Sequence, residues 1–198
     1  MIEVLLFDLF GVIARPQSEA GRRRLEALAG VPADAFWAAY WGLREPYDRG
    51  EVDGRAYWDQ VGVTLGRSLD AEALIAADVA SWAALDDEVV RFVGRIDGPR
   101  LALLSNIPEE HAVHHEVRLP RLDLVAFSCR IGHAKPEPAA FGWCLDQLQV
   151  DAAKVLFVDD TPANIDVAAA LGFQTHRFTG LAALRETLQP LVSIMDEA

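Results

Sequence analysis

Acidic side chains follow two short apolar runs that lie far apart in the sequence. Asp8 follows the run at 4–7, and the pair Asp159 and Asp160 follows the run at 155–158. Three carboxylates brought to one edge of a sheet would repel one another, and a hard cation such as Mg²⁺ would relieve that repulsion. We therefore expect a metal-dependent hydrolase. Simpler interpretations remain, because one aspartate can serve a turn and a pair can favour the start of a helix.

Two further segments carry polar side chains that could join these carboxylates. Ser105 and Asn106 follow the run at 101–104, and their hydroxyl and amide groups suit phosphate oxygens. Lys135 precedes a proline, so its backbone is expected to be extended and its ammonium group could balance the carboxylates. In isolation, the first segment could be a turn or a helix N-cap, and the lysine could be a surface residue.

The surrounding elements indicate a doubly wound α/β fold. Helix-like segments alternate with strand-like runs in the second half of the chain, which predicts a parallel sheet with helices on its faces. The helix expected at 162–172 begins with proline and ends at glycine, and the one at 137–149 has proline in its first turn. The apolar runs expected to form strands are 3–7, 101–104, 124–127, 155–158 and, more weakly, 173–178.

The region at 15–85 has apolar residues at helical spacing and contains no convincing strand. We expect it to be an all-helical cap, inserted into an α/β core that comprises 1–14 and 86–198. Four of the five tryptophans fall in this region. Most of them should pack the small core of the cap, and one or two could line a pocket that faces Asp8. The four are Trp37, Trp41, Trp58 and Trp82.

Composition narrows the function classes. The 198 residues include 18 basic and 30 acidic side chains, so the net charge is 18 − 30 = −12. Such a chain is not expected to bind nucleic acid, which requires a basic surface. We expect no membrane span, because no apolar stretch reaches the roughly 18 residues that a span requires. With no secretory signal evident, and with Cys129 and Cys144 expected to be reduced, we predict a cytoplasmic protein. The oligomeric state is not predicted.

In their order, the four polar segments resemble the motifs of the haloacid dehalogenase (HAD) superfamily of hydrolases. The resemblance covers essentially the whole chain. The segment at 47–52, followed by Tyr57 and Trp58, is similar to the cap of a subgroup that includes sugar-phosphate phosphatases and the N-terminal domain of soluble epoxide hydrolase. The resemblance implies Mg²⁺-dependent hydrolysis of a small phosphorylated metabolite under a closing cap.

The resemblance also implies roles for individual side chains. Asp8 would attack phosphorus and form an aspartyl-phosphate. Ser105 and Asn106 would hold the transferring phosphoryl group. Lys135 would stabilise its charge and orient the nucleophile.

The same resemblance implies a set of metal ligands. The Asp8 carboxylate, the backbone carbonyl of Phe10 and the Asp160 carboxylate would bind Mg²⁺. Asp159 would bond to metal-bound water, and Asn164 would help to position this loop.

Phe10 departs from the family pattern, because most HAD phosphatases have an aspartate at this position that acts as general acid and base. Loss of such a group costs about 10²–10⁴-fold in rate. Three possibilities stay open. The chain is a phosphatase with a substitute proton donor, a metal-independent 2-haloacid dehalogenase, or a protein that binds a phosphorylated ligand with little turnover. The candidate substitutes are His133, Glu137, Asp48 and Glu51, or water.

Two other groups of side chains are notable. Arg15 lies near the expected hinge into the cap, where it could reach a substrate anion or could simply be solvated. His111, His114 and His115 have no acidic or thiolate partner nearby apart from Glu110 and Glu116, so we expect a surface helix rather than a metal site.

Overall fold

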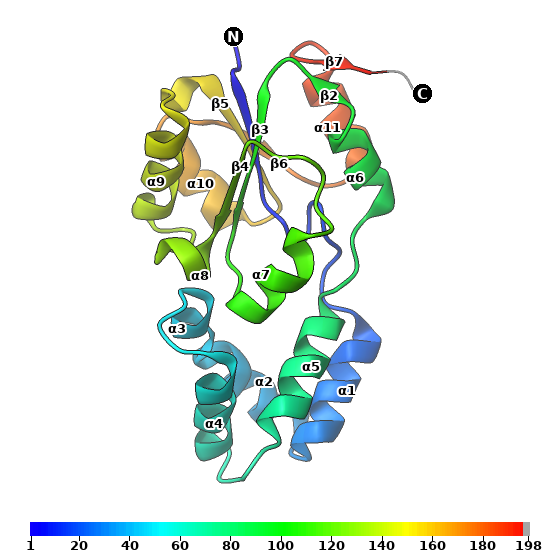
Figure 1. Cartoon of the computed structure of the whole chain (residues 1–198), viewed down its shortest axis with the longest axis vertical. Coiled ribbons are helices and arrows are strands. Elements are labelled where there is room, and N and C mark those ends of the chain that lie inside the picture. Colours follow the sequence, from blue (N-terminus) through cyan, green and yellow to red (C-terminus); the bar gives the residue numbers. More distant parts are fainter. Residues whose placement is uncertain (196–198) are drawn as a thin grey trace.

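A five-stranded parallel sheet forms the centre of the α/β core in this computed structural model, which describes residues 1–195 (Figure 1). The strand order is β4-β3-β1-β5-β6, so β1 lies between strands from two later parts of the chain. This order places a switch point beside β1, where open α/β sheets form their binding crevices. The strands are β1 (Val4–Phe7), β3 (Arg100–Ser105), β4 (Leu124–Phe127), β5 (Val155–Asp159) and β6 (Gln174–Arg177).

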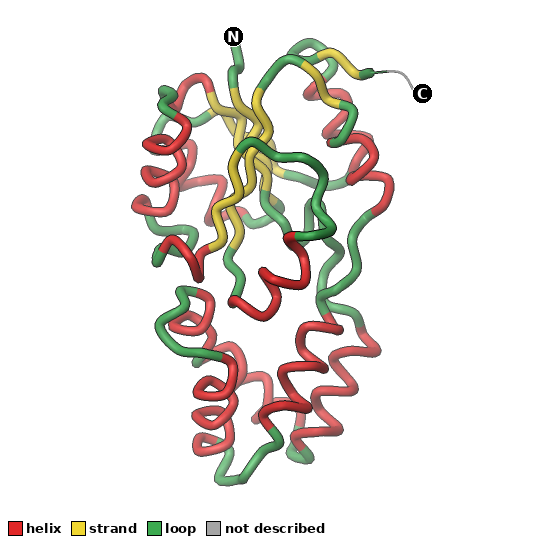
Figure 2. The backbone as a smooth tube through the Cα atoms, in the orientation of Figure 1, coloured by secondary structure: helices red, strands yellow, loops and turns green. Residues whose placement is uncertain are grey.

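Alternating side chains of the sheet pack against helices on its two faces. In β1, Leu5 and Phe7 join one apolar cluster, and Val4 and Leu6 join the other. This period of two is expected for a strand that is buried on both faces. The first face is covered by α6 (Asp87–Val93) and α11 (Leu181–Leu188), and the second by α9 (Pro138–Leu148) and α10 (Pro162–Ala170). Figure 2 shows these red helices on both sides of the yellow strands.

Five helices between β1 and α6 form the predicted helical insertion. They pack around an aromatic cluster that includes Phe36, Tyr40 and Trp58, each with no exposed surface. Side-chain caps fix several of their starts, as where the Asp53 carboxylate accepts a hydrogen bond from the backbone of Ala56. The helices are α1 (Glu19–Ala29), α2 (Ala33–Gly42), α3 (Arg44–Asp48), α4 (Gly54–Thr64) and α5 (Ala71–Ser81).

The two chain segments that join cap and core run side by side. The backbone of Arg15 donates to Ala84, at 2.8 Å, and the backbone of Asp86 donates to Ile13, at 2.9 Å. The insert therefore leaves the core and returns at one place. The exact domain boundaries at 14/15 and 85/86 stay a prediction.

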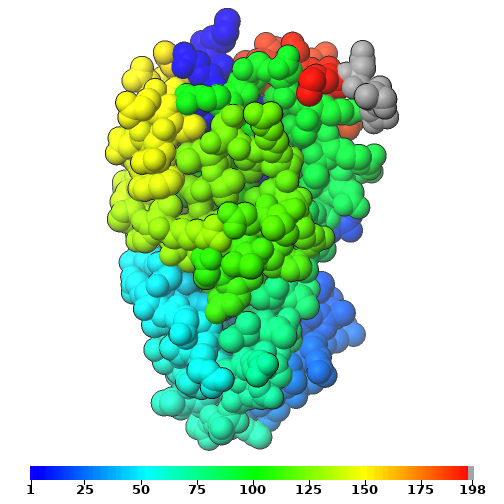
Figure 3. Space-filling model, in the orientation of Figure 1, coloured from blue at the N-terminus to red at the C-terminus, as the bar shows by residue number. Residues whose placement is uncertain are grey.

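Two short helices of the core face the cap. α7 (Glu109–Glu116) and α8 (Ser128–Ile131) lie between the sheet and the cap helices in Figure 1. Figure 3 shows that the surface of the cap meets the surface of the core. In the described part of the chain, the remaining elements are a 3₁₀ turn (Ala152–Lys154) and an antiparallel pair formed by β2 (Ile96–Asp97) and β7 (Ser193–Ile194). Within residues 1–195, no helix has the length and apolar character needed to cross a membrane.

Candidate active site

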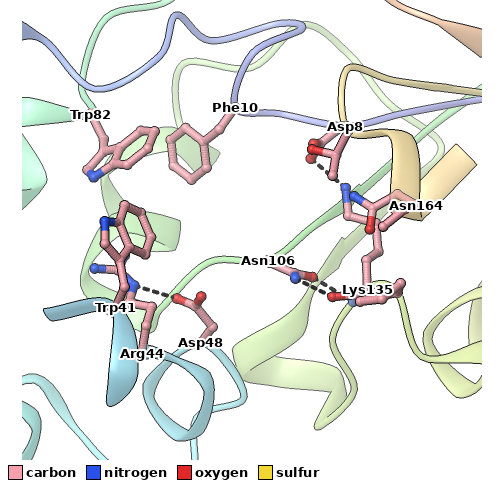
Figure 4. Close-up of a pocket in the computed structure, with 12 residues that line it drawn as sticks. Asp8, Phe10, Trp41, Arg44, Asp48, Trp82, Asn106, Lys135 and Asn164 are labelled. Carbon is pink, nitrogen blue, oxygen red and sulfur yellow. Dashed lines mark hydrogen bonds and ion pairs between the residues drawn. The ribbon is translucent and has the colours of Figure 1, made fainter. Parts of the chain in front are cut away.

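Asp8, Lys135 and Asp159 form a buried charged cluster at the carboxyl ends of β1 and β5. The Lys135 ammonium nitrogen lies 2.7 Å from Asp8 Oδ1 and 2.7 Å from Asp159 Oδ2. Because β1 and β5 are hydrogen-bonded neighbours, both carboxylates reach the same lysine. Figure 4 shows Asp8 and Lys135 pointing toward each other. The cluster holds a potential nucleophile beside a cation that can stabilise developing negative charge.

The ionisation of this cluster reflects its burial. Burial raises the pKa of Asp8 to about 7, with Lys135 acting against the rise and Asp159 adding to it. Burial alone would lower the pKa of Lys135, but the two adjacent carboxylates outweigh burial and raise it. Lys135 therefore stays cationic.

Two asparagines hold the cluster in place. The Asn106 amide donates to the backbone carbonyl of Lys135, at 2.7 Å, and its oxygen accepts from the Lys135 backbone nitrogen, at 2.7 Å. The Asn164 amide donates to Asp159 Oδ2, at 2.9 Å, and the Thr161 backbone donates to Asp159 Oδ1, at 2.8 Å. The main contact of Asn106 is therefore with the Lys135 backbone, a positioning contact that the sequence did not reveal.

Asp160 completes a group of three carboxylates that could hold a metal ion. One oxygen each from Asp8, Asp159 and Asp160 can be chosen so that all lie within 4.8 Å of one another. Gly11, with φ of +89°, lies directly against Asp160, and a Cβ atom there would come within 2.4 Å of its Oδ2. The positive φ of the turn after β1 favours glycine, and the absence of a Cβ atom leaves room for this carboxylate.

A cavity of about 380 Å³ separates these core residues from the cap. Phe10, Trp41 and Trp82 line one side of it, and Asp8 and Lys135 line the other (Figure 4). The prediction that one or two cap tryptophans line a pocket facing Asp8 is confirmed by Trp41 and Trp82. The full lining is Asp8, Phe10, Trp41, Arg44, Asp48, Trp82, Asn106, Lys135, Pro136, Thr161, Ala163 and Asn164.

A buried polar network in the cap supports the far wall of the cavity. The Arg44 guanidinium lies 2.9 Å from both Asp48 Oδ1 and Asp78 Oδ2, and it donates to the Tyr40 hydroxyl at 2.6 Å. Burial would raise the pKa of Asp78, but Arg44 and His111 lower it to about 2. Sequence reasoning missed Arg44 and Asp78, because nothing in their spacing separates them from charges on a solvated helix.

Several residues predicted for the site lie outside the cavity lining or make contacts that were not predicted. Arg15 is 63% exposed and lies 3.7 Å from Asp86, outside the cavity lining. Ser105 is fully buried at the end of β3, and its hydroxyl has no hydrogen-bond partner among the residues that the structure describes. The Phe10 ring packs against Trp82, and its carbonyl as a metal ligand stays a prediction.

Among the four candidate proton donors, Asp48 belongs to the cavity lining. Glu137 forms an ion pair with Arg49 of the cap, and exposed Glu51 lies 3.7 Å from the same arginine. Burial raises the pKa of Asp48, although Arg44 acts in the opposite direction.

The expectation that the three histidines lie on a surface helix was wrong for two of them, whereas His114 is partly exposed. His111 and His115 are 1% and 0% exposed, because α7 is covered by the cap. His111 Nε2 lies 3.4 Å from Asp78 Oδ2, and the His115 ring lies 5.4 Å from Phe10. The adjacent Glu110 carboxylate accepts from the cap at Gly54 N, at 2.9 Å.

A family model for haloacid dehalogenase-like hydrolases matches residues 2–172. The chain belongs to this family. It is a HAD hydrolase with the expected α/β core and helical insertion. Over 209 residues it is 26% identical to a D-ribitol-5-phosphate phosphatase of Bacteroides thetaiotaomicron, a match that covers 98% of this chain and 100% of that protein. It is also 26% identical to bifunctional epoxide hydrolase 2 of Mus musculus, over 93% of this chain and 38% of that protein.

Solved structures share the fold. A HAD family enzyme from Bacteroides thetaiotaomicron, solved with magnesium and inorganic phosphate, superposes with a TM-score of 0.73 at 19% identity, covering 89% of this chain and 93% of that one. The L-2-haloacid dehalogenase of Xanthobacter autotrophicus superposes with a TM-score of 0.65 at 19% identity, covering 98% of this chain and 85% of that one. At these identities the likeness shows the fold alone.

Proposed function

We propose that this HAD hydrolase cleaves small phosphate monoesters in a Mg²⁺-dependent reaction, with Asp8 as the nucleophile. The observation that carries the proposal is the group of three carboxylates, Asp8, Asp159 and Asp160. Asp8 and Asp159 share Lys135, and Asp8 lines a cavity of about 380 Å³. The full-length match to a D-ribitol-5-phosphate phosphatase supports a phosphorylated metabolite as substrate.

The charges of the cluster fit a divalent cation. Three carboxylates outnumber the one ammonium group of Lys135, and burial makes the excess negative charge costly. Asp8 and Asp160 would hold Mg²⁺ together with the Phe10 carbonyl, and Asp159 would bond to metal-bound water. Bound Mg²⁺ would neutralise charge on the phosphoryl oxygens.

The residues of the chain would then position and transfer the phosphoryl group. An Asp8 oxygen attacks phosphorus in line with the bond to the leaving oxygen, which departs with that bond's electron pair. Lys135, held by Asn106, stabilises the charge on the phosphoryl oxygens. The Ser105 hydroxyl, which has no hydrogen-bond partner within residues 1–195, would donate to one of these oxygens. Water then attacks the aspartyl-phosphate, releasing phosphate and restoring Asp8.

The test is phosphate release from p-nitrophenyl phosphate and a panel of polyol and sugar phosphates, with Mg²⁺ and with EDTA. We expect release that requires Mg²⁺ and is lost in Asp8→Asn. Asp146→Asn is the matched control, because Asp146 is exposed on α9 outside the cavity lining. Absence of release from well-folded protein with every substrate would overturn the proposal.

A 2-haloacid dehalogenase is the second candidate, favoured by one observation, the aromatic Phe10 beside the nucleophile. A halide leaves without a proton, so this reaction needs no acid there. Asp159 and Asp160 would repel an anionic haloacid, which ranks this candidate second. Metal-independent halide release from 2-chloropropionate would establish it instead of the phosphatase.

A further inference from the structure

Phe10, Trp82 and Trp41 form a continuous aromatic wall along the cavity. The Phe10 and Trp82 ring centroids are 4.9 Å apart, and those of Trp82 and Trp41 are 6.4 Å apart. All three side chains line the cavity, and Trp41 keeps half of its surface exposed. Figure 4 shows them opposite Asp8, Asn106 and Lys135. A group attached to a phosphate at Asp8 would therefore extend along aromatic rings.

The leaving-group side of the cavity offers no free acid among the lining residues, and the hydroxyl of Thr161 there is bonded to Asp160. Phe10 carries no acid, and Lys135 is committed to Asp8 and Asp159. Asp48 lies on the Arg44 side of the cavity, where its carboxylate accepts a hydrogen bond from the guanidinium. A leaving oxygen near Phe10 must therefore depart as an anion.

Departure as an anion favours some alcohols strongly over others. A phenol has a pKa of about 10, as in tyrosine. The pKa of water, to which an aliphatic alcohol is close, is about 15.7. An aryl oxide is thus expelled without protonation, whereas an alkoxide needs the missing acid.

Resting on the proposed function, we propose that this cavity selects phosphate esters of aryl alcohols, whose ring lies against Phe10, Trp82 and Trp41. In the first step, the bond from Asp8 to phosphorus forms and the bond from phosphorus to the aryl oxygen breaks. The aryl oxide leaves with the electron pair and takes a proton from solvent. Ring stacking on the aromatic wall contributes binding that a polyol phosphate gains only in part.

The missing acid has a second consequence, because the same group would activate water in the second step. Attack of water on the aspartyl-phosphate then proceeds without a base, and its proton passes to solvent. The phosphoryl-enzyme should accumulate with aryl substrates, giving a burst of released phenol followed by slower turnover. Different aryl phosphates should share one kcat, because they share this intermediate.

The experiment compares p-nitrophenyl, phenyl and polyol phosphates in steady-state and rapid-quench assays. We expect kcat/KM to fall by about 10²–10⁴-fold from p-nitrophenyl to polyol phosphate, with a burst of p-nitrophenol. Equal kcat/KM for the polyol and aryl phosphates would overturn this inference and leave the phosphatase intact. No phosphate release at all would overturn both.

Three variants test whether Phe10 or Asp48 determines how strongly the rate depends on the leaving group. Phe10→Asp should restore activity toward polyol phosphates and remove the burst, whereas Phe10→Leu should keep the steep dependence on the leaving group. Asp48→Asn should leave the dependence of kcat/KM on the leaving group unchanged. A steeper dependence in this variant would show that Asp48 is the proton donor and would contradict the inference. Circular dichroism and thermal melting establish that each variant is folded.

The aromatic wall is tested separately through substrate affinity. Trp41→Leu should raise KM for phenyl phosphate several-fold and leave inhibition by inorganic phosphate unchanged. Trp37→Leu is the matched control on the same helix, because Trp37 lies outside the cavity lining and bonds to Glu26. An equal rise in both variants would show a general effect on the cap and contradict the assigned contact.

Discussion

The two walls of the cavity are built in different ways. The core wall is built from side chains at the ends of adjacent strands. The register of these strands places Asp8 beside Asp159, and both carboxylates form ion pairs with Lys135. The cap wall consists of Trp41, Trp82 and a buried arginine network on packed helices. The core wall should therefore determine the chemistry, and the cap wall should determine stability of the cap and choice of substrate.

The sharpest test of this division is Asp8→Asn on the core wall. We expect at least about a 10⁴-fold loss in kcat/KM, because the amide cannot accept the phosphoryl group. The substitution keeps the shape of the side chain, so the protein should stay folded. Steady-state assays with p-nitrophenyl phosphate measure the loss, and retained activity would place the nucleophile elsewhere.

On the cap wall, Asp78→Asn should reduce stability with a smaller effect on chemistry. Arg44 would lose one of its two carboxylate partners and keep Asp48, and breaking a buried pair costs up to about 3–5 kcal/mol. Urea unfolding measures the change, with exposed Asp59→Asn as the control in the same cap. A loss equal to that of the control would mean that the network does not stabilise the cap.

The lowered pKa of Asp78 predicts that the stability of the protein depends on pH. The pKa of this aspartate in the folded protein, about 2, lies below the ordinary value of 3.8. The folded state therefore loses this stabilisation as pH falls from about 4 toward 2, and keeps it above that window. Urea unfolding across this range should show a shallower decline for Asp78→Asn than for the wild type.

Lys135→Met tests the cation of the core wall. We expect a drop in kcat/KM of about 10²–10³-fold, as for loss of one donor to a developing oxyanion. Lys154→Met is the control, because Lys154 pairs with Glu3 at 2.8 Å outside the cavity lining. Thermal melting establishes folding, since the variant also leaves two buried carboxylates unpaired. Unchanged turnover in folded protein would remove Lys135 from the mechanism.

The smallest expected effect concerns the contact between α7 and the cap. The Glu110 carboxylate accepts from the Tyr47 hydroxyl, at 2.8 Å, and from Gly54 N, at 2.9 Å, so it ties α7 to the cap. Glu110→Ala should change kcat and KM together by up to about tenfold, as loosened closure does. A change confined to thermal stability would show that this contact does not affect closure.

The contrast between the walls also explains what the sequence could predict. The parallel sheet, the helical insertion and the placement of Asp8 and Asp159 follow from apolar runs that end in polar residues, because strands position the residues after them. Lys135 lies beyond β4 and α8, and it was expected in the cluster because a cation there balances the carboxylates. The role of Asn106 in clamping Lys135 was missed, since it depends on the path of a separate loop.

The cap wall was less accessible to prediction. Trp41 and Trp82 could be expected near a pocket only as two of four tryptophans, because helix packing decides which ring turns inward. Burial of His111 and His115 was missed for the same reason, since their helix is polar in sequence and is covered only by the cap. Arg44 carries no local signal that distinguishes it from a solvated arginine.

The most direct test of the central claim is to acid-quench the enzyme during turnover of p-nitrophenyl phosphate and to examine its peptides by mass spectrometry. We expect one phosphoryl group on the peptide that contains Asp8, dependent on Mg²⁺ and absent from Asp8→Asn. Phosphate release in the wild type with no label on this peptide, or with the label on another residue, would show that Asp8 is not the nucleophile.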